Sequence, residues 1–368
     1  TTRLSAVVSV TSVSAMIENR GNSPTVGTWS DSLFLSDDAV FDVGDQYLAG
    51  FFQSGEPALA VAESYAIDDV AFLSQNLPAG DRFLLLVVDA FQYQPDSDRA
   101  NNVVVQPIHI QGPDLALSVE NSTASVVLGE NVHVDYRVTN IASSDAIATW
   151  GDYVYLSDDD VLSPDDSFLY AVDPTQGGLP AGESYTRSVE FLLPAFRTPG
   201  SKFLIIQADG WLAQGELGEA NNVVARPIRI DGPDLTVTSA TAPQSVNLGD
   251  LISISYVVTN SSPTKALADW YDGFYLSADA LLDGNDQLID SEFVMSQSPL
   301  AGGDSYTVTR DLQLPGNAPS NRFLLFVTDA FASQGETNEQ NNVRAVPLQG
   351  QRPDLLITAS TSPAIATL

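Results

Sequence analysis

The sequence predicts an all-β chain of tandem antiparallel β-sandwiches, with about 120 residues in each repeat. The tripeptide Pro-Asp-Leu begins at Pro113, Pro233 and Pro353, which lie 120 residues apart. Asn-Asn pairs, Trp-x-Asp and Leu-Ser-x-Asp recur between these landmarks in a constant order. No stretch has a helical period of 3.6 residues beyond about two turns. A unit of this length is too long for a solenoid turn and fits one small domain.

The second copy shows the strand pattern best. In the segment 132–138, four apolar residues alternate with His133, Asp135 and Arg137, which is the two-residue period of a half-buried strand. Turn-rich stretches separate further strands, expected at 114–120, 153–157, 168–172, 185–191, 202–208 and 222–230. Seven strands in one unit without helices indicate a Greek-key sandwich of the immunoglobulin-like type, here without a disulfide because the chain has no cysteine.

The repeat landmarks give the expected domain boundaries. We expect a first sandwich over 1–112, which lacks its first strand, a second over 113–232 and a third over 233–352. The segment 353–368 then reads as the first strand of a following repeat or as a donor strand.

Composition narrows the classes of function. The 368 residues contain 47 acidic and 15 basic side chains, for a net charge of −32. Such a surface repels nucleic acids and anionic lipid and attracts cations. Without cysteine and with only two histidines, thiolate chemistry and histidine-rich metal centres are excluded. No apolar run is long enough for a transmembrane helix, so we expect no membrane insertion.

Several motifs together resemble the CARDB domain, the cell-adhesion-related domain found in bacteria. They are Pro-Asp-Leu, Val-x-Asn at 258–260, Trp-x-Asp followed by Leu-Ser-x-Asp, and Glu-x-x-Glu-x-Asn-Asn at 336–342. The resemblance covers essentially the whole chain and implies exported bacterial or archaeal surface proteins without enzyme activity. The first copy departs from it, because Asp96 and Arg99 replace the two glutamates of the last motif.

Acidic residues recur at one expected end of each sandwich. In the second copy, Asp152 begins one strand and Asp209 ends its antiparallel neighbour, and Glu216 and Glu219 follow in the next loop. Convergent carboxylates without a basic partner favour calcium, a hard cation that prefers oxygen ligands. The equivalent candidate ligands are Asp31 and Asp89 in the first copy and Asp272, Asp329, Glu336 and Glu339 in the third.

A second acidic cluster falls in a loop at the opposite expected end. Its candidate calcium ligands are Asp38, Asp45, Asp159, Asp166, Asp279 and Asp286. The spacing lacks the alternation and glycine placement of an EF-hand. Two other interpretations stay open for both clusters: aspartates that cap turns through the backbone, and a surface adapted to salt.

The aromatic residues of the repeats lead to a further hypothesis about packing and binding. Trp29, Trp150 and Trp270 are expected to be packing anchors. Aromatics at equivalent loop positions, Phe91, Trp211 and Phe331, suit either a contact with the preceding domain or stacking on a ligand such as surface polysaccharide.

The first copy lacks a strand and 353–368 offers one, so copies of the chain are expected to join head to tail by strand donation, unless the chain is a fragment of a longer repeat array.

The sequence therefore predicts an extracellular or cell-surface, secreted, structural and adhesive protein. It is expected to form a calcium-stiffened rod whose partners are its own copies, further repeats and, as the alternative function, surface glycans. The acids recur in all three copies rather than forming one asymmetric constellation, so we expect no enzyme.

Overall fold

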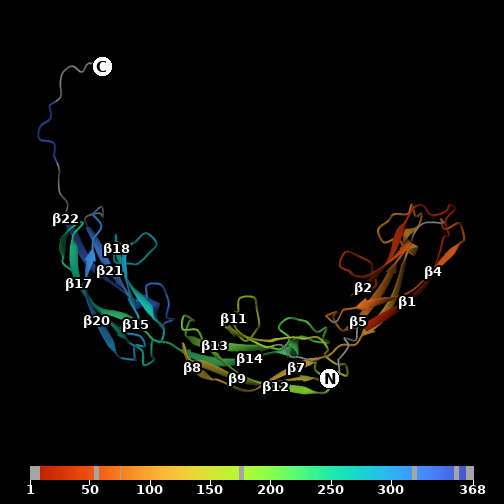
Figure 1. Cartoon of the computed structure of the whole chain (residues 1–368), viewed down its shortest axis with the longest axis horizontal. Coiled ribbons are helices and arrows are strands. Elements are labelled where there is room, and N and C mark those ends of the chain that lie inside the picture. Colours follow the sequence, from red (N-terminus) through yellow and green to blue (C-terminus); the bar gives the residue numbers. More distant parts are fainter. Residues whose placement is uncertain are drawn as a thin grey trace, which may run out of the picture. The chain divides into compact units, whose positions relative to one another are not determined.

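The computed structural model describes residues 9–53, 58–74, 76–173, 178–316, 321–351 and 356–361. Among these, every element except three short 3-10 helices is a β-strand, which confirms the predicted fold class (Figure 1). The chain divides into two compact units. One contains 1–122, 134–189 and 203–226, and the other contains 123–133, 190–202 and 227–368. These units do not follow the repeat boundaries, which stay a prediction.

The second repeat has two sheets that pack as a sandwich. Its strands are β7 (Leu115–Ser122), β8 (Ser125–Val127), β9 (Asn131–Asn140), β10 (Asp152–Ser157), β11 (Ser167–Val172), β12 (Ser184–Leu192), β13 (Gly200–Gln207) and β14 (Val223–Asp231). One sheet has the order β12-β9-β7 and the other β11-β10-β13-β14-β8. Each predicted strand is found within two residues of its expected ends.

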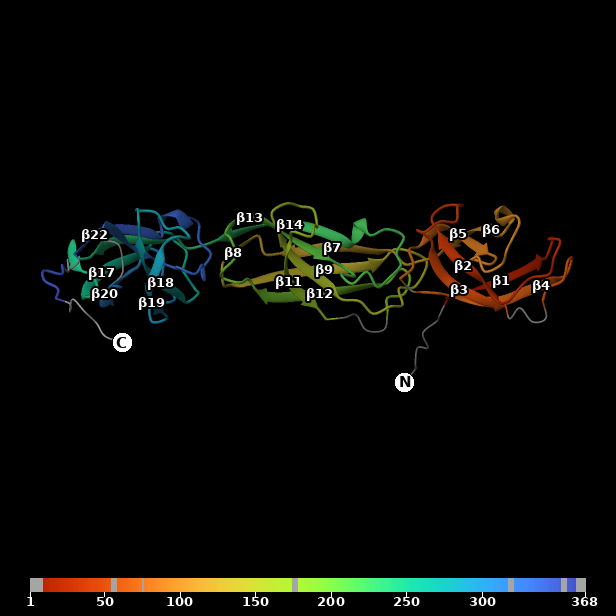
Figure 2. The same cartoon turned by 90° about the horizontal axis from the view of Figure 1, so that it is seen from above.

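The third repeat repeats this topology. Its strands are β15 (Leu235–Thr241), β16 (Ser245–Asn247), β17 (Leu251–Asn260), β18 (Trp270–Ser277), β19 (Gln287–Val294), β20 (Ser305–Gln313), β21 (Asn321–Val327) and β22 (Val343–Gln351). The sheets have the orders β15-β17-β20 and β16-β22-β21-β18-β19. Seen from above in Figure 2, β17 and β20 lie side by side, as their antiparallel pairing requires.

The first repeat has fewer paired strands among its described residues. Its strands are β1 (Ser9–Glu18), β2 (Trp29–Ser36), β3 (Gln46–Gln53), β4 (Ser64–Leu73), β5 (Gly80–Val87) and β6 (Val103–Ile110). Here one sheet contains only β1 and β4, and the other has the order β3-β2-β5-β6. No counterpart of β7 or β15 occurs in the described part of this repeat.

Two strand pairings depart from the antiparallel pattern. β8 and β16 lie parallel to β14 and β22, the last strands of their own repeats. Each has only three residues, which is too short to show a two-residue alternation, so the sequence analysis missed both. β8 and β16 are each the edge strand of a five-stranded sheet.

Each core lies between the two sheets of its repeat. In the third repeat, Trp270, Phe274, Phe326 and Tyr256 pack together at its centre. In the first, the core is smaller and contains Leu33, Phe51 and Ile67, with Ala15 and Ile17 packed at its margin. No helix in the described part of the chain has the length and apolar character to cross a membrane.

Candidate functional site: the acidic end of each sandwich

The Trp-x-Asp motif places a buried aspartate at the start of a central strand. Asp152 on β10 accepts hydrogen bonds from the hydroxyls of Tyr136 (2.8 Å) and Tyr185 (2.8 Å). Tyr136 belongs to β9 and Tyr185 to β12, so one carboxylate on the five-stranded sheet binds two strands of the three-stranded sheet. Trp150 completes the chain of contacts by donating from Nε1 to the Tyr185 hydroxyl at 3.2 Å.

The third repeat contains the same network. Asp272 accepts from Tyr256 (2.8 Å) and Tyr306 (2.6 Å), and Trp270 Nε1 donates to the Tyr306 hydroxyl at 3.2 Å. In the first repeat Ala15 stands where the other two have Tyr136 and Tyr256, so Asp31 receives a hydroxyl from Tyr65 alone, at 2.6 Å. The tryptophans are buried in all three repeats, which confirms their predicted role as packing anchors.

Burial governs the protonation of these aspartates. Desolvation raises the pKa of Asp31, Asp152 and Asp272 above the ordinary value, while the tyrosine hydroxyls that donate to them oppose the rise. Burial also raises the pKa of Tyr136, Tyr256 and Tyr306, and the neighbouring carboxylate adds to the rise because a phenolate would face it. The network therefore connects the two sheets through hydrogen bonds inside the core.

Asp209 and its equivalents shape the following loop. Asp89, Asp209 and Asp329 have left-handed backbones, with φ of 48°, 48° and 44°. The Asp209 carboxylate accepts from the backbone nitrogens of Ala213 (3.0 Å) and Gln214 (2.8 Å). Its own nitrogen donates to Asp152 Oδ1 at 3.3 Å, so the structure does bring these two residues together. The sequence predicted the proximity but not the backbone partners.

Glu216 and Glu336 fasten the first strand of their repeats. Glu216 Oε2 accepts from the backbone nitrogen of Leu115 at 2.6 Å, and its Oε1 accepts from Asn222 Nδ2 at 2.9 Å. Glu336 makes the same two contacts, with the nitrogen of Leu235 and with Asn342 Nδ2. We call this arrangement the glutamate clamp. It explains why Pro-Asp-Leu and Glu-x-x-Glu-x-Asn-Asn occur together, because the two motifs are in contact.

The rest of the clamp uses the neighbouring motif residues. Asn222 Nδ2 also donates to Glu219 at 3.0 Å, and Asn342 Nδ2 to Glu339 at 3.3 Å. The other asparagine of each pair binds the aspartate of Pro-Asp-Leu: Asn221 donates to Asp114 and Asn341 to Asp234, both at 2.8 Å. These side-chain contacts are what the sequence analysis missed. The recurrence of both motifs at one fixed separation was the available signal.

The glutamates of the clamp have raised pKa values. Burial raises the pKa of Glu216 to about 8 and that of Glu336 to about 9, and the second glutamate of each pair adds to the rise through repulsion. Burial also raises the pKa of Asp329 to about 6. Arranging these acids in one loop therefore costs free energy at neutral pH when no cation neutralises them.

The second acidic cluster forms turns. Asp38 Oδ1 accepts from the Val40 nitrogen at 2.7 Å, and Asp159 and Asp279 accept in the same way from the nitrogens two residues on, each at 2.9 Å. Asp45, Asp166 and Asp286 accept from the nitrogen three residues before them, at 2.8, 2.7 and 2.7 Å. These contacts match the turn-capping alternative, and each aspartate keeps one oxygen outside them.

The structure separates the sixteen predicted calcium ligands into these three roles: sheet connection, loop capping and strand clamping. Within the described residues, no three or more histidine, cysteine, aspartate or glutamate side chains are arranged to hold a metal ion. Besides burial, the charges of Glu219 and Asp209 raise the pKa of Glu216, and the charge of Asp209 raises that of Glu219. The calcium assignment stays a prediction.

Exposed aromatic side chains gather on one face of the third repeat. Tyr271 packs against Phe293 with ring centroids 4.7 Å apart, and against Phe331 at 5.4 Å. Phe331 is 52% exposed, and Trp211 and Phe91 at the equivalent positions are also exposed. Phe331 therefore packs against a strand of its own repeat and offers a free face.

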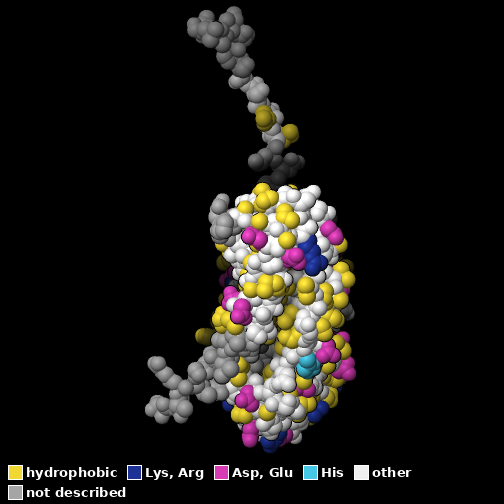
Figure 3. All heavy atoms as spheres, turned by 90° about the vertical axis from the view of Figure 1, so that its right-hand side faces the viewer, with side chains coloured by type: hydrophobic (Ala, Val, Ile, Leu, Met, Phe, Trp, Pro, Cys, Tyr) yellow, Lys and Arg dark blue, Asp and Glu magenta, His cyan; other side chains and the backbone are white. Residues whose placement is uncertain are grey.

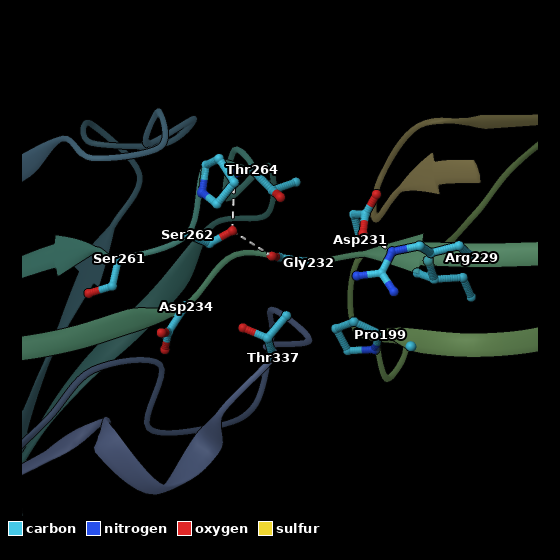
Figure 4. Close-up of a pocket in the computed structure, with 12 residues that line it drawn as sticks. Pro199, Arg229, Asp231, Gly232, Asp234, Ser261, Ser262, Thr264 and Thr337 are labelled. Carbon is cyan, nitrogen blue, oxygen red and sulfur yellow. Dashed lines mark hydrogen bonds and ion pairs between the residues drawn. The ribbon is translucent and has the colours of Figure 1, made fainter.

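A polar pocket adjoins the segment that joins β14 to β15 (Figure 4). Ser262 Oγ donates to the carbonyl of Gly232 at 2.9 Å, and Thr337 Oγ1 donates to the carbonyl of Pro233 at 3.2 Å. The Arg229 guanidinium is paired with Asp231 at 2.9 Å. The pocket's polar groups thus serve to hold residues 231–234 in place.

Comparison with known proteins finds a family similarity for part of the chain. The CARDB family profile matches residues 232–346. The solution structure of a CARDB domain from Pyrococcus furiosus is similar to this chain at 17% identity and a TM-score of 0.26, covering 33% of this chain and 97% of that one. No curated protein matches.

Two further solved structures are similar to parts of this chain. A β-glucosidase from Listeria innocua is 19% identical over 34% of this chain, with a TM-score of 0.24, and the match spans only 17% of that enzyme. The sporulation control protein Spo0M from Bacillus subtilis is 11% identical over 65% of this chain and 91% of its own, with a TM-score of 0.24.

The fold and the family match together define the class: this is an immunoglobulin-like β-sandwich protein. Within it, residues 232–346 are similar to the CARDB family.

Proposed function

We propose that this chain is an extracellular structural and adhesive protein of the bacterial cell surface, without catalytic activity. The CARDB match of residues 232–346 is the observation that carries the proposal. The acids of the sandwich ends support a non-catalytic role, because hydrogen bonds from tyrosine, asparagine or backbone groups occupy them. A general acid or base needs access to a substrate proton, and such engaged groups lack it.

Calcium is the proposed stiffening ion. The clamp acids support it, because a cation bound at Glu216 and Glu219 would offset the repulsion from neighbouring acids that adds to the burial-driven rise of their pKa. Since the described acids form no ready cage, binding would require the loop that carries them to rearrange. The proposed consequence is mechanical: neutralised loops hold a rod of sandwiches extended.

Thermal unfolding and small-angle scattering with millimolar calcium, and then with excess chelator, test this proposal. We expect calcium to raise the melting temperature and the maximum dimension, because a ligand that binds only the folded state stabilises it. Magnesium at equal concentration is the control for a general ionic effect. If both curves are unchanged by calcium, the carboxylates act only in turns and clamps.

A glycan-binding role is the second candidate, favoured by the packed and exposed aromatics Tyr271, Phe293 and Phe331. Aromatic faces suit the apolar faces of sugar rings, and the chain's charge favours a neutral polysaccharide. Titration of the chain with neutral polysaccharides, measured by isothermal titration calorimetry, would detect binding. The variant Phe331→Ala should abolish it, whereas Phe196→Ala, an exposed aromatic elsewhere, should leave it intact.

We also propose that copies of this chain associate by strand donation. The edge of β1, which has no second strand beside it among the described residues, and the Pro-Asp-Leu sequence of the segment 353–368 support this assembly.

A further inference from the structure

One position in the loop after β5, β13 and β21 carries opposite charges in different repeats. In the first repeat it is Arg99, whose guanidinium donates to Asp89 Oδ2 at 3.2 Å and also to the carbonyl of Gln94. Glu219 and Glu339 stand at the same position in the second and third repeats. The exchange replaces a cation by an anion at one defined point of a loop that is otherwise built alike.

The aspartate that binds the guanidinium keeps its own hydrogen bonds in the other repeats. Asp89 Oδ2 accepts from the Gln94 nitrogen at 2.8 Å and from Arg99 at the same time, so its second lone pair serves the cation. In the second repeat Asp209 Oδ2 accepts from the Gln214 nitrogen at 2.8 Å, and the third repeat has the same bond at 2.9 Å. The corresponding lone pair there faces the place of a glutamate instead of an arginine.

Two carboxylates therefore lie near each other in the second and third repeats. Burial, and after it the charge of Asp209, raises the pKa of Glu219. Burial raises the pKa of Asp329 to about 6, and the charge of Glu339 adds to the rise. The aspartates are buried and the glutamates are exposed, so each pair is open to solvent on one side. A cation between the two carboxylates would neutralise their repulsion.

A buried amide beside each pair has an oxygen without a donor among the described residues. Asn222 and Asn342 are 1% and 4% exposed, and their Oδ1 atoms accept no hydrogen bond there. Their Nδ2 atoms donate to both glutamates of their own loop. A half-turn about the Cβ–Cγ bond exchanges the two atoms and turns the oxygen toward the exposed glutamate. A cation bound at that glutamate would satisfy an oxygen whose burial otherwise costs free energy.

The groups that meet at this point have the chemistry that calcium prefers. They are a buried carboxylate, an exposed carboxylate, a backbone carbonyl and an amide oxygen, and calcium takes six to eight such ligands in flexible geometry, with water among them. Only two of the four are acids. The site therefore does not require three acidic side chains in one cluster, an arrangement that the described part of the chain does not contain.

The general negative charge of the chain would not single out these places. On the face shown in Figure 3, acidic side chains lie in small scattered groups rather than in one broad patch. Such a surface attracts cations diffusely, and salt screens the attraction. Specific binding needs the convergent oxygens described above.

We propose that the second and third repeats each bind one calcium ion, at the place that the Arg99 guanidinium fills in the first repeat. The ligands of each ion are an aspartate, a glutamate and an asparagine side chain and one backbone carbonyl of the same loop. They come from Asp209, Glu219, Asn222 and Gln214 in the second repeat and from Asp329, Glu339, Asn342 and Gln334 in the third. This inference rests on the calcium-stiffened rod proposed above and reduces its candidate ligands to two defined sites.

Calorimetric titration of the full chain with calcium tests the two sites, after treatment with chelator and in about 0.15 M sodium chloride to screen diffuse attraction. We expect two ions per chain. Glu219→Arg and Glu339→Arg should each leave one ion, and the two substitutions together should leave none. These variants should fold, because the first repeat has arginine at this position. Glu130→Arg, which changes an exposed glutamate outside the loop by the same charge, should keep both ions.

The reverse substitution gives an independent check. Arg99→Glu should add a third ion, because it leaves Asp89 and the Gln94 carbonyl in place and supplies the missing carboxylate. A stoichiometry that stays at two in Arg99→Glu, or that is unchanged in Glu219→Arg and Glu339→Arg, would overturn the assigned sites.

The outcomes separate the sites from the proposed stiffening. Two ions that bind as expected, without a change in melting temperature or maximum dimension, would keep the sites and overturn the stiffening. A calcium-dependent rise in melting temperature that persists in the double arginine variant would overturn the sites and leave the stiffening standing. A wild-type chain that binds no calcium at millimolar concentration would overturn both.

Discussion

An aspartate with almost no exposed surface lies between two sheets in each repeat, and one or two tyrosine hydroxyls from the facing sheet donate to it. The Trp-x-Asp motif indicated that Asp152 and Asp272 lie at the start of a central strand, and in the structure Asp152 begins β10 and Asp272 is the third residue of β18. Their tyrosine partners come from strands 16 to 34 residues away, so only the packed sandwich identifies them.

Removing one hydroxyl from this network should destabilise the third repeat. Tyr306→Phe leaves the Asp272 carboxylate and Trp270 Nε1 each without one partner, in a site that water does not reach. We expect a loss of about 1.5–3 kcal/mol, the usual range for a hydrogen bond to a charged group. Urea unfolding measures it, with Tyr271→Phe at the partly exposed surface as the control. Equal effects of the two substitutions would contradict a structural role for the network.

Glu336 should make stability fall as the pH rises. Its pKa is about 9 in the folded chain and near 4.5 when exposed, so the folded state holds more protons between these values. Its contribution is therefore fully present below about pH 4.5 and is lost as the pH approaches 9. The difference in unfolding free energy between the wild type and Glu336→Gln, measured from pH 5 to 9, isolates this dependence. A difference that stays flat with pH would show that Glu336 is ionised throughout.

At the level of whole elements, period-two alternation located the seven strands of the second repeat to within two residues, because each strand has one face in the core. The two three-residue strands that run parallel to β14 and β22 were missed, since their pairing depends on residues about 104 positions along the chain. The clamp was missed for the same reason, because it joins a strand to a loop about 101 residues later.

Loss of the clamp should loosen the first strand of its repeat. In Glu336→Ala the buried nitrogen of Leu235 loses its acceptor, which should cost about 1–3 kcal/mol. Hydrogen exchange at the Leu235 amide should quicken far more than exchange within β17. Asp311→Ala, an exposed acid on β20, is the matched control and should leave the Leu235 amide protected.

For the molecule as a whole, charge is the dominant property, because the chain has 47 acidic residues and only 15 basic ones. Self-repulsion of this size favours expanded states and is screened by salt. The acids are distributed over turns, clamps and buried networks, so the charge has several structural origins rather than one.

Salt should therefore raise the stability of the whole chain. We expect the melting temperature to increase steadily with sodium chloride from about 0.01 to 1 M, since the Debye length falls over this range from about 30 to 3 Å. Calcium at matched ionic strength separates binding from screening. A melting temperature that depends on ionic strength alone would favour the salt-adapted interpretation of the surface.

The sequence by itself determined the fold class, the repeat, the strand positions and the CARDB resemblance, because periodicity and recurring motifs are local or strictly spaced properties. Only the tertiary structure decided what the acids contact. Asp152, Asp209 and Glu216 stand in one acidic pattern in the sequence, yet the first connects two sheets, the second shapes a loop and the third clamps a strand. Their partners are tyrosine hydroxyls and backbone nitrogens from distant positions, and a carboxylate's role follows from which donors the packed chain brings to it.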